Sequence, residues 1–176
     1  MHQKRRVTKI RELLIGRSLN LTEGPAVYAF WWLGDLSAMS SARRSIKLKG
    51  PGGKPVNVTF EKNWSKSQAY PCLYVGKTTG LRKRVSQHLL RTKECRLTSG
   101  CRSARVKPTA YNSSCQLRQG IEWLFPRNDL PVELIYDSVG LSTVTEFGDN
   151  PVAERFFLEN KLIGDYEPWI NIDTER

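Results

Sequence analysis

The sequence lacks the long apolar runs that membrane-spanning and exported proteins carry. No stretch approaches the about 20 apolar residues that a spanning helix needs. The N-terminal residues, MHQKRRVTKI, contain no apolar signal core. We therefore expect an intracellular, cytoplasmic protein with no membrane contact.

Closely spaced cysteine pairs are also absent. The four cysteines are Cys72, Cys95, Cys101 and Cys115, and no Cys-x-x-Cys pair exists. In an intracellular protein we expect all four to stay reduced. A zinc site built from His88 and the last three cysteines is an alternative, but the spacing fits no common zinc finger.

Acidic residues are scarce relative to basic ones. The chain of 176 residues has 28 Lys and Arg against 17 Asp and Glu, which gives a formal net charge of +11. This charge favours a polyanionic partner, most often nucleic acid, although ribosome association or an anionic membrane surface would also account for it. The length suits one domain, residues 1–176, with insertions.

The most informative stretch is residues 72–90, CLYVGKTTGLRKRVSQHLL. Its apolar start, which stops at Gly76, predicts a short buried strand. The Thr-Thr-Gly at 78–80 has the chemistry of a turn and a helix N-cap. Leu81 and Val85 then begin an apolar face at helical spacing. The sequence therefore predicts a strand, a tight turn and a helix.

Polar side chains of this stretch converge on one space. Tyr74 and Lys77 stand at the strand end, while Arg84 and His88 lie one helical turn apart on the helix. Arg offers a phosphate a planar fork of donors, and Lys offers a compact positive charge. We interpret this set as a site that handles a phosphodiester. A solvated basic helix face after an ordinary strand is an alternative that this stretch leaves open.

Two elements are predicted upstream. Residues 7–21 have apolar residues at near-helical spacing among basic ones, which predicts an amphipathic helix. We expect this helix to cap the core, with contact to a nucleic-acid backbone as the alternative. Residues 26–33 are too aromatic for a loop and too short for a confident helix, so they predict a strand. Alternation along that strand places Tyr28 and Phe30 on one face and Val27 on the other.

A basic insertion, residues 34–70, follows this strand. Apolar residues alternate before and after Gly-Pro-Gly-Gly at 50–53, which predicts a β-hairpin, and Glu61 is the only acid between 37 and 70. A basic β-ribbon can enter a groove of DNA or follow its phosphates. We expect this hairpin to recognise DNA, with a solvated decoration as the alternative.

The segment after the central helix is predicted from weaker signals. Residues 92–112 form a basic loop rich in Ser and Thr, residues 113–125 form a core-packing helix, and residues 131–138, PVELIYDS, form a third strand. The basic residues that we expect to contact DNA come from the insertion, the central helix and this loop: Arg43, Arg44, Lys47, Lys49, Lys54, Arg82, Arg91, Arg102, Arg105 and Lys107.

A last helix is predicted over residues 152–163, before Gly164. Asn150 can cap it, and Pro151 suits its first turn. Glu159 falls on the same side as Phe156, in an apolar stripe. A carboxylate placed there costs free energy unless a cation or another partner binds it.

Three separated motifs resemble those of the GIY-YIG nucleases. Tyr74-Val75-Gly76-Lys77, with Arg84 and His88 in the helix, is similar to the second half of the family signature. Ala26-Val27-Tyr28 is similar to the first half, with Ala in place of Gly. The end of the chain, from Leu158-Glu159-Asn160 to Asn171, resembles the closing motif of the nuclease domain used in bacterial nucleotide excision repair. The two half-signatures lie much further apart here than in the family.

The resemblance implies an α+β fold with a small three-stranded, mainly antiparallel sheet flanked by helices. It implies hydrolysis of a phosphodiester with one Mg²⁺ or Mn²⁺ ion bound by Glu159. Arg84 would stabilise the transition-state charge, and His88 would relay a proton or hold the phosphate. Tyr74 is our first choice of general base and Tyr28 the second, with Lys77 or metal-bound water favouring the phenolate. The implied catalytic set is Tyr28, Tyr74, Lys77, Arg84, His88, Glu159 and Asn171.

A sequence-specific duplex DNA endonuclease of restriction type, from a prokaryote or phage, is the leading interpretation. The long insertion suits target recognition, and cutting both strands suggests a homodimer on DNA. A structure-specific repair or mobile-element nuclease is the second interpretation. A nucleic-acid-binding module without catalysis is a third, and the sequence does not distinguish DNA from RNA.

Overall fold

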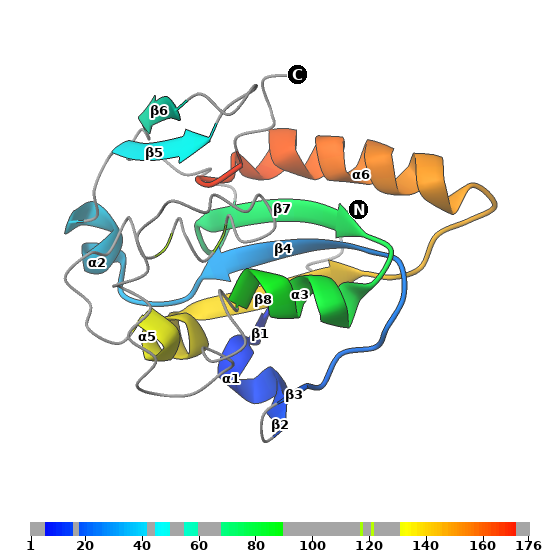
Figure 1. Cartoon of the computed structure of the whole chain (residues 1–176), viewed down its shortest axis with the longest axis horizontal. Helices are drawn as coiled ribbons and strands as arrows, with labels where there is room; N and C mark the ends of the chain where they lie inside the picture. The colour runs from blue at the N-terminus through cyan, green and yellow to red at the C-terminus, as the bar shows by residue number, and fades with distance from the viewer. Residues whose placement is uncertain are drawn as a thin grey trace.

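The computed structural model describes residues 6–15, 18–41, 45–49, 55–59, 68–89, 117, 121 and 131–171. The described chain is α+β, with an antiparallel sheet flanked by helices (Figure 1), as the sequence predicts. The elements follow in the order β1 (Thr8–Lys9), α1 (Ile10–Leu13), β2 (Leu14–Ile15), β3 (Ser18–Leu19), β4 (Ala26–Trp32), α2 (Leu36–Ser41), β5 (Ser45–Lys49), β6 (Pro55–Thr59), β7 (Cys72–Thr78), α3 (Leu81–Leu89), α5 (Pro131–Ser138), β8 (Val139–Val144) and α6 (Pro151–Tyr166).

The main sheet has four strands in the order β1-β8-β4-β7, and every neighbouring pair is antiparallel. The prediction of three strands is therefore wrong by one, because the two-residue strand β1 pairs with β8. The predicted strands around Tyr28 and Tyr74 are confirmed as β4 and β7. They are direct neighbours, with Tyr28 opposite Gly76.

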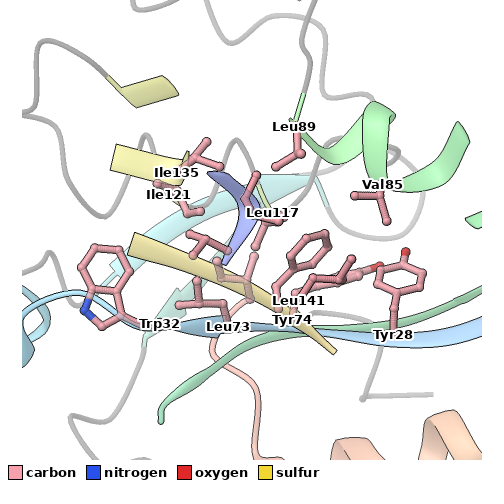
Figure 2. Close-up of a cluster of buried hydrophobic side chains, with 14 of the residues drawn as sticks. Tyr28, Trp32, Leu73, Tyr74, Val85, Leu89, Leu117, Ile121, Ile135 and Leu141 are labelled. Atoms are coloured by element: carbon pink, nitrogen blue, oxygen red, sulfur yellow. The ribbon is translucent and has the colours of Figure 1, made fainter. Parts of the chain in front are cut away.

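Helices cover both faces of this sheet, and that is why all of β4 is buried. One face carries Tyr28 and Phe30 and packs against α1, α3 and α5. The other face carries Val27 and packs against α6. Figure 2 shows side chains of the first face, among them Val85 of α3 near Tyr28, and Leu89 of α3 near Leu117. The predicted alternation along residues 26–33 is confirmed.

The long helix predicted over residues 7–21 is wrong. Among the described residues of this segment, only Ile10–Leu13 is helical, and it lies between the edge strand β1 and a short antiparallel pair of β2 with β3. The free edge of β8 offers backbone hydrogen bonds to Thr8 and Lys9, and these compete with a helix. Ile10 is still fully buried, so the predicted packing on the core is confirmed.

The third strand lies eight residues later than predicted. Residues 131–138 form α5, and the strand is β8, Val139–Val144. Adjacent Ile135 and Tyr136 both face the core, which a helix allows and a strand does not. Gly140 weakens the strand signal in the sequence. In the structure the side chains of Val7 and Leu33 pack close to it, because a Cβ there would lie 2.5 Å from Val7 Cγ1 and 2.7 Å from Leu33 Cδ1.

The other predicted elements are found where the structure describes them. β5 and β6 pair as an antiparallel hairpin. Asn150 caps α6 by accepting a hydrogen bond from the Ala153 amide (3.2 Å). α6 runs three residues past its predicted end, because Gly164 stays helical and Glu167 ends the helix with a φ of 47°. Of the segment 113–125, Leu117 and Ile121 are helical and buried, and the loop 92–112 lies outside the described residues.

The edge of β7 is covered by the end of the chain. Trp169 and Ile170 donate backbone hydrogen bonds to Cys72 O (3.1 Å) and Leu73 O (2.8 Å). Covering protects an edge strand from pairing with another chain. No helix among the described ranges is long and apolar enough to cross a membrane.

Candidate active site

A buried hydrogen bond between Tyr28 and His88 is the centre of the candidate site. Tyr28 comes from β4 and His88 from α3, and the Tyr28 hydroxyl lies 2.7 Å from His88 Nε2. The start of α3 is fixed beside β4, because the Leu81 amide donates to the Gly24 carbonyl (2.9 Å). His88 also contacts the ring of Tyr74, with the centroids 4.9 Å apart.

Gly76 makes room for this arrangement. A Cβ built on Gly76 would lie 2.6 Å from the Tyr28 hydroxyl oxygen and 2.8 Å from Tyr74 Cε1. The rings of both tyrosines therefore pass directly over the Gly76 backbone. Glycine is favoured at position 76 because the two tyrosine rings approach its backbone closely, and not because of a positive φ angle.

Arg84 brings a positive charge to the two phenols. Its Nε lies 3.4 Å from the Tyr28 hydroxyl, and its side chain also hydrogen-bonds Tyr74. Burial lowers the pKa of Arg84, but attraction to Tyr28 and Tyr74 outweighs burial and raises it. The guanidinium is thus charged and partly exposed, which suits it to meet a phosphate.

Tyr28 and His88 are both neutral at pH 7. Burial raises the pKa of Tyr28 above its ordinary value, with a further contribution from Tyr74, while Arg84 acts in the opposite direction. Burial lowers the pKa of His88 to about 3, and the charge of Arg84 adds to this effect. The site can hold a proton between the phenol oxygen and an uncharged imidazole.

The second nitrogen of His88 is unusual. His88 is fully buried, and no described residue makes a hydrogen bond to its Nδ1. If Tyr28 donates to Nε2, Nδ1 carries the ring proton; if Nε2 donates to Tyr28, Nδ1 is an acceptor. With either assignment Nδ1 has no partner among the described residues, and buried polar groups are usually satisfied unless they serve a function.

Lys77 and Glu159 form an ion pair on the opposite face of β7. Lys77 Nζ contacts Glu159 Oε2, and the side chains are 27% and 14% exposed. Lys77 Nζ also lies 3.9 Å from the centroid of the Phe156 ring. The prediction that Lys77 favours a Tyr74 phenolate is not supported, because alternation along β7 directs the two side chains to opposite faces. Glu159 has the partner that its position requires.

Asn171 is engaged by the backbone of β7. Its Oδ1 accepts from the Val75 amide (2.8 Å), and its Nδ2 donates to the Val75 carbonyl (2.7 Å). The side chain therefore continues the hydrogen-bonded edge that Trp169 and Ile170 begin. In this geometry Asn171 positions the edge of β7 beside the site.

Glu159 is the residue that fits a bound cation. The described ranges contain no group of three or more His, Cys, Asp and Glu side chains that could hold a metal. Mg²⁺ is often held by one or two carboxylates, with water and substrate phosphate completing its shell. Glu159 is largely buried and already pairs with an ammonium. A single-carboxylate site that is completed by the substrate is consistent with these residues.

The predicted DNA contacts are mostly untested. Arg82 is exposed, and its guanidinium donates to the Leu21 carbonyl from Nε (2.8 Å) and Nη2 (2.6 Å). Lys47 and Lys49 lie in strand β5, and their side chains are outside the description. The remaining predicted contacts lie outside the described residues: Arg43, Arg44, Lys54, Arg91, Arg102, Arg105 and Lys107.

Two features of α6 were not predicted. Arg155 is buried and donates to the Pro151 carbonyl (2.9 Å) and the Thr78 carbonyl (2.7 Å), which ties α6 to the end of β7. Its spacing, one helical turn before Glu159, is the only signal that the sequence offered. The second feature is a pair of exposed rings, Phe156 and Phe157. The apolar stripe predicted to include Phe156 is therefore not buried at that residue.

Comparisons of the chain with models of protein families, with curated proteins and with solved structures give no match. The case for a function therefore depends on the residues and their geometry.

Proposed function

We propose that this protein is a metal-dependent endonuclease with the GIY-YIG fold, and that it hydrolyses phosphodiester bonds of DNA. The observation that supports this most is the buried Tyr28–His88 hydrogen bond with Arg84 beside it. A phenol, a neutral imidazole and a guanidinium at one strand end are the parts that phosphodiester hydrolysis needs: a proton acceptor and a stabiliser of phosphate charge.

Tyr28 is the better-supported proton acceptor of the two tyrosines. Its raised pKa excludes a standing phenolate at pH 7. When its hydroxyl donates to His88 Nε2, the phenol oxygen takes a proton from the attacking water while its own proton moves to the imidazole. Arg84 holds the phosphate and balances the charge that develops on its oxygens. Tyr74 supports Arg84 from the neighbouring strand.

Glu159 would hold one Mg²⁺ or Mn²⁺ ion, which neutralises phosphate charge and stabilises the leaving oxygen. Lys77 then has to give up its contact with Glu159 Oε2. It stays on the same face of β7, where a freed ammonium can contact a phosphate of the substrate.

The test is digestion of plasmid and phage DNA with Mg²⁺, Mn²⁺ or EDTA, for the natural protein beside Glu159→Gln. We expect metal-dependent fragments that the variant does not produce. Asp165→Asn is the matched control, because Asp165 is an acid of the same helix that pairs with Lys161 (2.9 Å) on the exposed side. Cleavage by Glu159→Gln at the natural rate would overturn the assignment.

The pattern of fragments separates the two types of nuclease. Discrete bands from intact duplex support a sequence-specific enzyme of restriction type, which the basic insertion 34–70 favours. Cleavage confined to flaps, bulges or branches supports a structure-specific enzyme. The exposed rings of α6 favour an unpaired nucleotide at the site, and they are the basis of the next inference.

A further inference from the structure

An apolar patch lies on the exposed side of α6. Val152, Phe156 and Phe157 are 55%, 53% and 73% exposed. Val152 and Phe156 are one helical turn apart and are therefore neighbours on the helix surface, and Phe157 follows Phe156 about 100° further round the helix. The opposite side of α6 packs Leu158 and Leu162 against the sheet. The core thus does not need the patch, and contiguous exposed apolar surface of this kind often marks a binding site.

The patch begins at the candidate active site. Phe156 precedes Glu159 by one helical turn, and its ring contacts Lys77 Nζ, which pairs with Glu159. A ring, an ammonium and a carboxylate therefore share one face of β7. A ligand that covers the ring brings its neighbouring atoms to the cation and the carboxylate.

A nucleobase matches this surface better than a protein side chain does. A base presents a flat apolar face and is joined on both sides to phosphates, so it complements a ring with an ammonium beside it. The net charge of +11 favours a polyanion for the chain as a whole. A base inside an intact duplex has its faces covered by neighbouring base pairs, so the base that stacks here must be unpaired.

We propose that Phe156 and Phe157 form a stacking platform for one unpaired base next to the cleaved phosphate. This inference rests on the proposed nuclease function, and it specifies the substrate class. DNA with a bulge, flap or mismatch at the cut binds more tightly than paired DNA, because the cost of unstacking has already been met. An intact duplex is bound with the base drawn out.

The test measures binding in EDTA, where no cleavage occurs. One duplex carries 2-aminopurine as a single bulged base, and its partner has the same sequence fully paired. We expect the natural protein to quench the bulged base and to prefer the bulged duplex. Phe156→Ala with Phe157→Ala removes the quenching and lowers affinity for the bulged duplex by about 5- to 100-fold. Affinity for the paired duplex changes far less.

Two controls keep the result interpretable. Ile15→Ala removes a comparably exposed apolar side chain, 62% exposed, from the separate sheet of β2 and β3, and should leave the preference intact. Thermal unfolding of the double variant should match the natural protein, because exposed side chains contribute little to stability. Unchanged quenching or preference in the folded double variant would overturn the proposal. So would conversion of a dimer to a monomer, because the patch would then join two copies of the chain.

This inference and the nuclease proposal can fail separately. If plasmid DNA is cleaved normally and the double variant shows no loss of bulge preference, only the stacking platform is wrong. If quenching depends on the two rings but no DNA is cleaved with any metal, the platform stands and the nuclease assignment is wrong.

Discussion

The two faces of β7 carry different kinds of chemistry. On the α3 face, Tyr28 and His88 are buried, neutral and hydrogen-bonded to each other. On the α6 face, Lys77 and Glu159 form an ion pair that is partly open to solvent. Buried neutral groups can move a proton without exchange with bulk water, whereas a partly open ion pair can exchange its cation. One strand thus carries a buried neutral pair on one face and a partly exposed ion pair on the other, and, in addition to burial, the charge of Glu159 still contributes to raising the pKa of Tyr28.

Arg84→Ala should have the largest effect, and it concerns the cleavage proposed for the α3 face. It removes the charge that meets the phosphate, so we expect cleavage to fall by about 100- to 1000-fold, as for the loss of one transition-state donor. Affinity for DNA in EDTA should fall far less. Single-turnover cleavage and filter binding measure the two effects, with Lys83→Ala, an exposed cation of the same helix, as the control. Equal losses of cleavage and affinity would make Arg84 a binding residue only.

The buried imidazole should make stability depend on pH. The pKa of His88 is lowered to about 3 in the folded protein, so the unfolded chain binds more protons between that value and 6.5. Stability from neutral His88 is fully present above pH 6.5 and falls by up to about 1.4 kcal/mol for each pH unit below it.

Urea unfolding between pH 7 and 5 measures this slope. His88→Gln keeps a hydrogen-bonding group toward Tyr28 but does not titrate, so its slope in this range should be smaller than that of the natural protein. Equal slopes for the two proteins would show that His88 is not held neutral. Carboxylates such as Asp137, whose pKa is lowered by its hydrogen bond from Arg11, affect both proteins alike and at lower pH.

Gly76→Ala tests whether both tyrosines need the bare backbone of β7. The new Cβ would lie 2.6 Å from the Tyr28 hydroxyl, so we expect a loss of stability of about 1–3 kcal/mol. Gly164→Ala is the matched control, because a Cβ there meets nothing within 4 Å. In a helix interior that change should stabilise by about 0.5–1 kcal/mol. Chemical denaturation measures the free energy of unfolding of both variants. An unchanged value for Gly76→Ala would contradict the close approach of the two tyrosine rings to the Gly76 backbone.

Lys77→Met should have the smallest effect, and it concerns the cation site proposed on the α6 face. Without the competing ammonium, Glu159 should bind Mn²⁺ more tightly, by up to about tenfold, as expected for a partly exposed ion pair. Titration calorimetry without DNA measures this affinity, and Glu159→Gln gives the background. Weaker Mn²⁺ binding in Lys77→Met would show that Lys77 supports the cation site instead of competing for it.

Much of the α3 face was predictable because its signals are local. Tyr74, Arg84 and His88 lie within one strand, turn and helix, and helical spacing directs the last two to one side. Tyr28 followed from alternation along β4. The α6 face was predicted in part, since the stripe on α6 identified Glu159 but its partner comes from β7.

The sequence alone is enough to predict β4, β7, α3 and α6, because short apolar runs, turn residues and the Asn150-Pro151 helix start act over a few positions. Only the tertiary structure decided between helix and strand at residues 131–144. Ile135 and Tyr136 both reach the core from α5, whereas Val139–Val144 pairs with β1 and β4, and both of those strands come from distant parts of the chain. The use of Asn171 as an edge cap has the same cause. Each depends on backbone pairing between remote segments, which no local pattern records.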